Sequence, residues 1–169
     1  MTRKQKAGHR RWGARGGKVP GSRRGDIMAP QQRSKVMSRI RAKDTSPELA
    51  LANQMAAFGL MFERHCPDLP GKPDFVFRGV MVAVFVDGDF WHGFRFPLWQ
   101  HKLSPNWRKK IGATRARDRK NFSSLRRRGW TVLRIWEHQI ERDPTGCANR
   151  ASEAVRLRVK KIGRTSGAL

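Results

Sequence analysis

The sequence lacks the features that define three large classes of protein. It has only two cysteines, Cys66 and Cys147, which form neither a disulfide framework nor a paired metal motif. No apolar run approaches the roughly 18 residues of a membrane-spanning helix, and the basic N-terminus lacks the apolar segment of a secretory signal. We therefore expect a cytoplasmic protein without structural disulfides or a membrane span.

Acidic residues are also scarce. The chain of 169 residues has 13 aspartates and glutamates against 37 lysines and arginines, which gives a formal net charge of +24 at pH 7. Such a charge exceeds what solubility requires and indicates a polyanionic partner. We expect double-stranded DNA. A membrane surface is disfavoured because no basic amphipathic helix stands alone.

The length suits one domain with its own core, and we expect a monomer. Residues 1–30 are rich in Lys, Arg and Gly and show no apolar period, which predicts a disordered basic arm. The arm either adds affinity for phosphates or serves only as a solubilising tail. Residues 31–162 form the expected domain, and residues 163–169 form a C-terminal tail.

Two apolar runs in the middle of the chain predict a β-hairpin. Phe75–Phe77 and Val80–Val86 are separated by Arg78-Gly79, a turn signal. The second run is apolar at every position, which indicates a strand buried on both faces. Trp130–Trp136 predicts a further strand. The expected fold is therefore α/β, with a small mixed β-sheet flanked by helices.

Two carboxylates stand at the outer ends of this hairpin. Asp74 opens the first strand and Asp87 closes the second, so antiparallel pairing brings them together. A two-residue turn would place Asp74 opposite Ala83 and a five-residue turn opposite Val86, and the sequence does not fix the register. Paired carboxylates suit Mg²⁺, which prefers oxygen ligands. For the pair taken alone, ordinary polar residues of strand ends are the simpler interpretation, and the aromatic and histidine residues that follow, Phe90-Trp91-His92, reverse that preference.

Four helices are expected around the strands. Ser34 can cap a short helix carrying Met37 and Ile40. Ser46 and Pro47 begin a second helix, which ends near Gly59. The others span Pro105–Arg128 and Ala148–Lys161. The inward residues of the second helix are expected to be Leu49, Ala52, Met55 and Ala56, and those of the third Trp107, Ile111, Thr114, Asp118, Phe122 and Leu125.

Asp118 therefore falls on an apolar helix face, where a carboxylate needs a partner because burial of a lone charge is costly. Arg115 and Arg119 are the structural candidates. His92 is the functional candidate, because an aspartate that holds an imidazole orients it and raises its basicity.

Four stretches, in this order, resemble the very short patch repair endonucleases: Pro70–Phe75, Val84–His92, Ala116–Arg119 and Gly129–Glu137. The resemblance extends from about Ser34 to His138. It implies a restriction-endonuclease-like nuclease core for the single domain. It also implies a Mg²⁺-dependent endonuclease that nicks one DNA strand beside a T:G mismatch.

The resemblance also implies roles for individual residues. Asp74 would hold the metal with help from Asp87 and the Val86 carbonyl, and His92 would be the general base, oriented by Asp118. Glu48 would belong to the active site, although its place in the first turn of a helix is itself sufficient to explain a carboxylate. The residues that would insert or stack at the mismatch are Met37, Phe90, Trp91 and Trp107, Met37 being alternatively a core residue.

Two departures from the family are visible. Many relatives carry a structural zinc where this chain has Asp89, Phe94 and His138. Asp89, His101 and His138 could supply three of the four ligands that zinc needs, but we expect zinc to be absent and the loop 94–99 to be held by apolar packing. Asp87 stands where the best-known relatives have a histidine.

Two other functions fit the same features. One is a nicking nuclease that recognises a DNA site without requiring a mismatch. The other is a non-catalytic basic DNA-binding protein in which the acids are structural. Metal-dependent cleavage would exclude the second, and a requirement for a T:G pair would exclude the first.

Overall fold

A computed structural model describes residues 43–166 of the chain. The expected basic arm and the expected helix around Met37 lie outside these residues. The sheet has four strands in the order β1 (Glu63–Arg64), β2 (Phe75–Phe77), β3 (Val82–Asp87) and β4 (Thr131–Trp136). The first three are antiparallel neighbours, and β4 runs parallel to β3. The predicted mixed sheet is confirmed, with the two-residue strand β1 as an addition.

The hairpin register falls between the two that the sequence allowed. Phe75 pairs with Val84 and Phe77 with Val82, so the same register places Asp74 opposite Phe85. Four residues link the strands because the 3₁₀ turn η1 (Arg78–Val80) is followed by Met81 in the left-handed region at φ 55°. As a result, Asp74 Oδ2 accepts a hydrogen bond of 2.7 Å from the Val86 backbone N–H.

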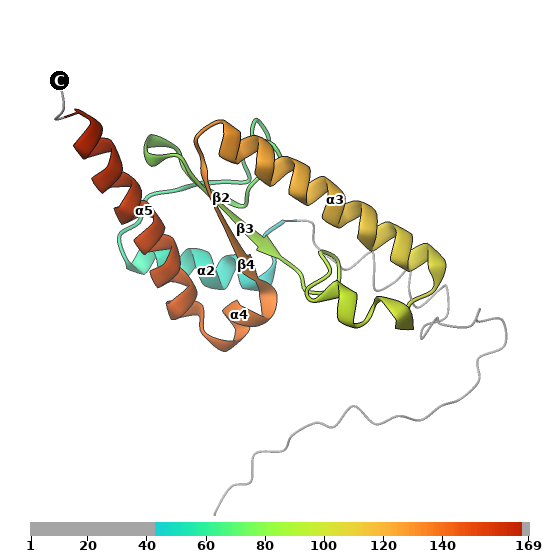
Figure 1. The fold of residues 1–169 in the computed structure, drawn as a ribbon. Helices are drawn as coiled ribbons and strands as arrows, with labels where there is room; N and C mark the ends of the chain where they lie inside the picture. The colour runs from blue at the N-terminus through green and yellow to red at the C-terminus, as the bar shows by residue number, and fades with distance from the viewer. Residues whose placement is uncertain (1–42, 167–169) are drawn as a thin grey trace, which may run out of the picture.

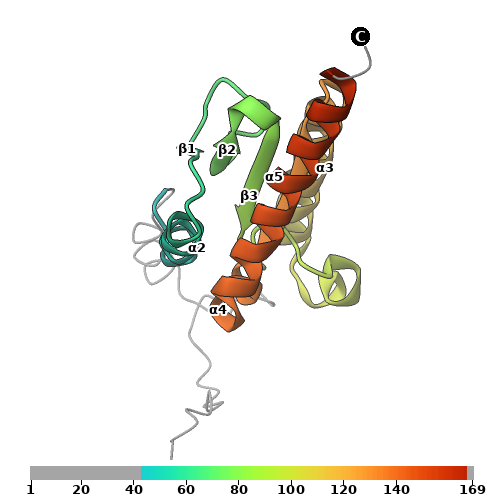
Figure 2. The same cartoon turned by 90° about the vertical axis from the view of Figure 1, so that its left-hand side faces the viewer.

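Helices cover both faces of the sheet. The helices are α2 (Ser46–Ala57), α3 (Pro105–Arg127), α4 (Glu137–Arg142) and α5 (Pro144–Ser166). In both ribbon views α2 and α3 lie on opposite sides of β3 (Figure 1; Figure 2). Val82 and Val84 of β3 pack in the core cluster that includes α2 and α5, whereas Ala83 and Phe85 pack with α3. This alternation explains why the strand is apolar throughout.

Helix α2 differs from the prediction in its cap and its inward face. Its N-cap is Thr45, one residue earlier than expected, and the Thr45 hydroxyl accepts from the Glu48 N–H at 3.4 Å. The buried face consists of Glu48, Leu51, Ala52 and Met55, whereas Leu49 is 40% exposed. Glu48 therefore lies on the buried face of α2 rather than on its solvent side.

The long helix α3 buries the predicted residues Ile111, Asp118, Phe122 and Leu125. It ends before Gly129, whose φ of 83° suits glycine. Helix α5 starts at Pro144 and continues to Ser166, beyond the predicted end at Lys161. No helix within residues 43–166 is both long and apolar enough to cross a membrane.

Candidate active site

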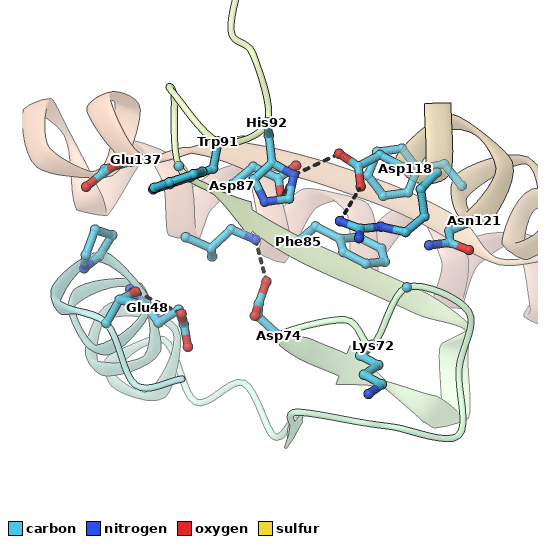
Figure 3. Close-up of a pocket in the computed structure, with 17 residues that line it drawn as sticks. Glu48, Lys72, Asp74, Phe85, Asp87, Trp91, His92, Asp118, Asn121 and Glu137 are labelled. Atoms are coloured by element: carbon cyan, nitrogen blue, oxygen red, sulfur yellow. Dashed lines mark hydrogen bonds and ion pairs between the residues drawn. The ribbon is translucent and has the colours of Figure 1, made fainter. Parts of the chain in front are cut away.

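A pocket opens at the carboxyl end of β3, where α2, α3 and the loop after β3 converge. The predicted residues Glu48, Asp74, Asp87, His92 and Asp118 all line it. Figure 3 shows Glu48 and Asp74 on one side of the end of β3, and His92 and Asp118 on the other. Five residues up to 70 positions apart in the sequence are therefore brought to one site.

Asp74 is held by the sheet but has no cationic partner in the described part of the chain. Its backbone N–H donates to the Val84 carbonyl at 3.0 Å, and none of the salt bridges within residues 43–166 involves its carboxylate. Burial raises the pKa of the Asp74 carboxyl to about 7, and the nearby charges of Glu48 and Asp87 act in the same direction against the Val86 hydrogen bond. A bound cation would favour the ionised form of this group.

Glu48 has partners for both of its oxygens. Oε1 accepts from the Thr45 hydroxyl at 2.8 Å, and Oε2 accepts from the Asp44 N–H at 2.9 Å. Thr45 caps the helix by accepting from Glu48, and the Glu48 carboxylate in turn accepts from Thr45 and Asp44. These contacts account for a carboxylate that is only 5% exposed. The structural explanation of Glu48 is therefore sufficient, although the residue also lines the pocket.

The loop after β3 folds back so that His92 returns to the end of that strand. The His92 N–H donates to the Gly88 carbonyl at 3.1 Å, and the Phe94 N–H donates to the Asp89 carbonyl at 2.8 Å. Gly93 follows with φ 67°, and a Cβ there would meet Ile111 of α3 at 2.9 Å. A glycine is required at this point because the loop passes so close to α3.

His92 contacts two carboxylates through the same ring nitrogen. Its Nδ1 lies 2.7 Å from Asp118 Oδ2 and 3.1 Å from Asp87 Oδ1. Because an ionised carboxylate can only accept, Nδ1 carries the hydrogen and Nε2 is the acceptor nitrogen of the neutral ring. The expected pairing of His92 with Asp118 is thus present, and Nε2 has no protein partner within residues 43–166.

Arg134 completes this cluster and was missed in the sequence. Its Nε donates to Asp87 Oδ2, and its Nη2 lies 3.4 Å from Asp118 Oδ2. The cationic partners of Asp118 are therefore Arg134 and, at 3.9 Å, the exposed Arg117, and the expectation of Arg115 or Arg119 is wrong because neither forms an ion pair with it in the described part of the chain. The available signal was a single charged residue inside the apolar strand β4.

Both oxygens of Asp87 are engaged, Oδ1 by His92 and Oδ2 by Arg134. Burial raises the pKa of the Asp87 carboxyl, while the charges of His92 and Arg134 oppose that rise. The role of Asp87 at a metal stays a prediction. In this arrangement the carboxylate would have to give up one of its two partners to take part.

The aromatic residues predicted to meet DNA gather in one cluster beside the pocket. The ring centroids of Phe90 and Trp91 are 5.3 Å apart, and each lies 5.5 Å from the ring of Trp107. Trp99, which the prediction did not include, stacks on Phe90 at 5.7 Å. Lys110 lies over Trp91 and Trp107, within 5.3 Å of both ring centroids.

The loop that follows is packed through aromatic side chains, as expected. Phe94 lies 4.5 Å from the ring of His138 and 5.0 Å from that of Trp136. His138 Nδ1 and Asp89 Oδ1 are 2.6 Å apart, so these two candidate zinc ligands bind each other. His101 belongs to neither group of three potential ligands found within residues 43–166.

Comparison with known proteins gives consistent matches. The family profile described as DNA mismatch endonuclease Vsr matches residues 25–97. The chain is 40% identical to the type II nicking enzyme V.NmeDIP of Neisseria meningitidis serogroup C over 134 residues, which cover 78% of this chain and 90% of the relative. It is 37% identical to the type II nicking enzyme V.XorIIP of Xanthomonas oryzae pv. oryzae over 117 residues, 68% of this chain and 86% of that protein. It is also 37% identical to the DNA mismatch endonuclease Vsr of Escherichia coli K12 over 117 residues, 66% of this chain and 73% of that protein.

Proposed function

Because the chain belongs to the Vsr family of DNA mismatch endonucleases, we propose that this DNA endonuclease nicks one strand of a duplex beside a T:G mismatch and uses Mg²⁺. One observation carries the proposal. A single pocket holds a carboxylate that has no cationic partner within residues 43–166 and, across the end of β3, a histidine whose Nε2 has no partner in the same residues and can accept a proton. We further propose that the protein is cytoplasmic and acts as a monomer.

The donor set on one side of the pocket fits Mg²⁺. Asp74 would hold the ion, together with the Val86 carbonyl, and Glu48 would adjoin them. Oxygen donors of this kind are what Mg²⁺ prefers, and the raised pKa of Asp74 would be relieved by a cation. When bound, Mg²⁺ supplies positive charge that stabilises the phosphoryl transition state and lowers the pKa of attacking water.

The other side of the pocket moves the proton. The Nε2 atom of His92 accepts it from the attacking water, and Asp118 retains the Nδ1 hydrogen. The Asp118 carboxylate then stabilises the imidazolium that forms, which is how a carboxylate assists a general base. The 2.7 Å hydrogen bond holds the ring in one tautomer and one orientation throughout.

DNA would approach along a cationic border. Lys72 and Arg117 line the pocket, and both are exposed. Phosphate contacts of this kind supply affinity and register but little sequence information. The aromatic cluster would supply the discrimination, because a mismatched step unstacks at lower cost than a paired one.

The experiment compares labelled duplexes that differ by one T:G pair, with Mg²⁺ or with EDTA. We expect a nick in one strand, only with Mg²⁺ and faster on the mismatched duplex. Absence of metal-dependent nicking on every duplex would contradict the proposal and favour a non-catalytic DNA-binding protein.

A second candidate shares the chemistry but not the recognition. Five relatives at 30–40% identity are named type II nicking enzymes, and that name mentions no mismatch. The second candidate is therefore a nuclease that nicks at a DNA site without requiring a mismatch. Equal nicking rates on matched and mismatched duplexes of the same sequence would select this candidate.

A further inference from the structure

We propose that Arg134 is a positioning residue for the reaction: its guanidinium fixes the carboxylates of Asp87 and Asp118, and these two carboxylates fix the imidazole of His92. The inference rests on the proposed function, since it assigns the orientation of the proposed general base to a residue outside the pocket. Arg134 does not line the pocket, so it can act only through its partners.

Arg134 lies on a rigid element, with its side chain held along its length. In the parallel register of β3 and β4, Arg134 pairs with Phe85, and two residues further along each strand Trp136 pairs with Asp87. The guanidinium carbon lies 4.1 Å from the Trp136 ring centroid and 5.3 Å from that of Phe122. Two aromatic contacts restrict the guanidinium to one orientation, which a site built on a strand can maintain precisely.

The four side chains form a closed ring of contacts. Arg134 binds Asp87 through Nε and reaches Asp118 Oδ2 through Nη2 at 3.4 Å. His92 Nδ1 contacts the same two carboxylates, at 3.1 Å and 2.7 Å. Asp118 Oδ2 is therefore shared by the imidazole and the guanidinium, and no member can move without changing the position of the others.

Two carboxylates so close together repel each other, and both are buried: Asp87 is 4% exposed and Asp118 is 7% exposed. A cation between them removes that repulsion and keeps both in place. Arginine is suited to this because its donors form a rigid planar fork that can serve two acceptors at once. A lysine would keep the charge but lose the fork, so substitution by lysine separates geometry from charge.

A merely structural role makes different predictions. If Arg134 only neutralises buried acid, Arg134→Lys should behave like the wild type once folded, and any loss should be independent of His92. If it positions His92, the loss should depend on the presence of that histidine.

The test uses the full chain and measures single-turnover nicking of a T:G duplex at saturating protein and Mg²⁺, with DNA affinity and thermal melting measured in parallel. We expect Arg134→Lys to keep its fold and its DNA affinity within about twofold, but to nick about 10- to 100-fold more slowly, as is usual when a partner that orients a histidine is lost. Arg126→Lys is the matched control, because Arg126 also lies over the Phe122 ring, at 6.0 Å, but forms no hydrogen bond or ion pair with a carboxylate within residues 43–166. It should nick at the wild-type rate.

Two further readouts address the mechanism. In a His92→Ala background, Arg134→Lys should change the residual rate by less than about twofold, because residues that act as a unit are not additive. In nuclear magnetic resonance spectra, the His92 Nδ1–H proton hydrogen-bonded to Asp118 should be observed in the wild type and in Arg126→Lys, and should be shifted or lost in Arg134→Lys.

The inference is overturned if Arg134→Lys nicks at the wild-type rate with an unchanged His92 signal, or if its loss is fully retained without His92. A wild-type protein that nicks no duplex would instead contradict the proposed function, while the His92 signal would still report whether Arg134 orients the ring.

Discussion

The two sides of the pocket treat buried negative charge in opposite ways. On the side of Asp74, the carboxylate is held only by a backbone N–H and has no cation within residues 43–166. On the side of His92, the carboxylates of Asp87 and Asp118 are both bound by the imidazole and by Arg134. The difference supports the proposal that the first side takes a cation from solution, whereas the carboxylates of the second already have cationic partners in the protein.

This division assigns one task to each side. The Asp74 side would hold the metal, and the His92 side would accept the proton. Substitutions on one side should therefore leave the task of the other side intact, and the following predictions test that separation.

The largest effect is expected from Asp74→Asn. The change removes a ligand charge but leaves the cationic surface intact, so nicking should fall by more than about 10³-fold while DNA affinity is unchanged or tighter. Single-turnover rates and binding isotherms on the same T:G duplex measure both. Nicking at a near wild-type rate would show that the two sides are wrongly assigned.

The next effect is expected on the opposite side. His92→Ala should lower the single-turnover rate by about 10²–10⁴-fold, the usual contribution of a general base. Asp118→Asn should lower it less, and the double variant should resemble His92→Ala. Two independent losses that multiply would mean that the Asp118 carboxylate is structural.

The aromatic cluster borders the pocket, which Trp91 also lines, and we expect it to affect recognition rather than either task. Trp91→Ala and Trp107→Ala should each reduce the ratio of nicking on T:G over matched duplex by about 5- to 150-fold, because a stacked base contributes about 1–3 kcal/mol. Deleting residues 1–25 should instead weaken binding to every duplex and reduce its salt dependence. A larger change in the ratio after the deletion than after either substitution would reverse this assignment.

The smallest effect concerns stability and follows from the direction in which the pKa of Asp74 is shifted. Its folded pKa of about 7 lies above its ordinary value, so the folded state keeps a proton that the unfolded chain has lost, and this group reduces stability as the pH rises from about 4 to 7. At about 1.4 kcal/mol per pKa unit, Asp74→Asn should raise the free energy of unfolding by about 2–4 kcal/mol at pH 8. Chemical denaturation at pH 8 and pH 4 measures it, and an equal gain at both values would contradict this cause.

Much of this arrangement could be predicted from local patterns. The apolar runs gave the hairpin, and helical spacing placed Asp118 on the buried face of α3, where its pairing with His92 could be anticipated. Helix α2 was less well predicted. The observed N-cap is Thr45 where Ser46 was expected, and the buried face contains Leu51 where Leu49 was expected.

The parts that could not be predicted depend on contacts between distant segments. Arg134 is a charged residue in a strand, and only the parallel pairing of β3 with β4 brings it to Asp87. The position of Asp74 depends on a turn whose length the sequence left open. The proposed division of tasks depends on which carboxylates have a cationic partner and which do not. This difference is therefore visible only in the folded structure.

The most direct test of that division is metal binding by the full chain without DNA. Mn²⁺ is a suitable probe, because it shares the oxygen preference of Mg²⁺ and its unbound fraction can be measured by electron paramagnetic resonance. The account predicts that Asp74→Asn abolishes Mn²⁺ binding, whereas His92→Ala and Arg134→Lys retain it. Binding that survives Asp74→Asn, or that is lost with His92→Ala, would contradict the claim that the metal belongs to the Asp74 side of the pocket.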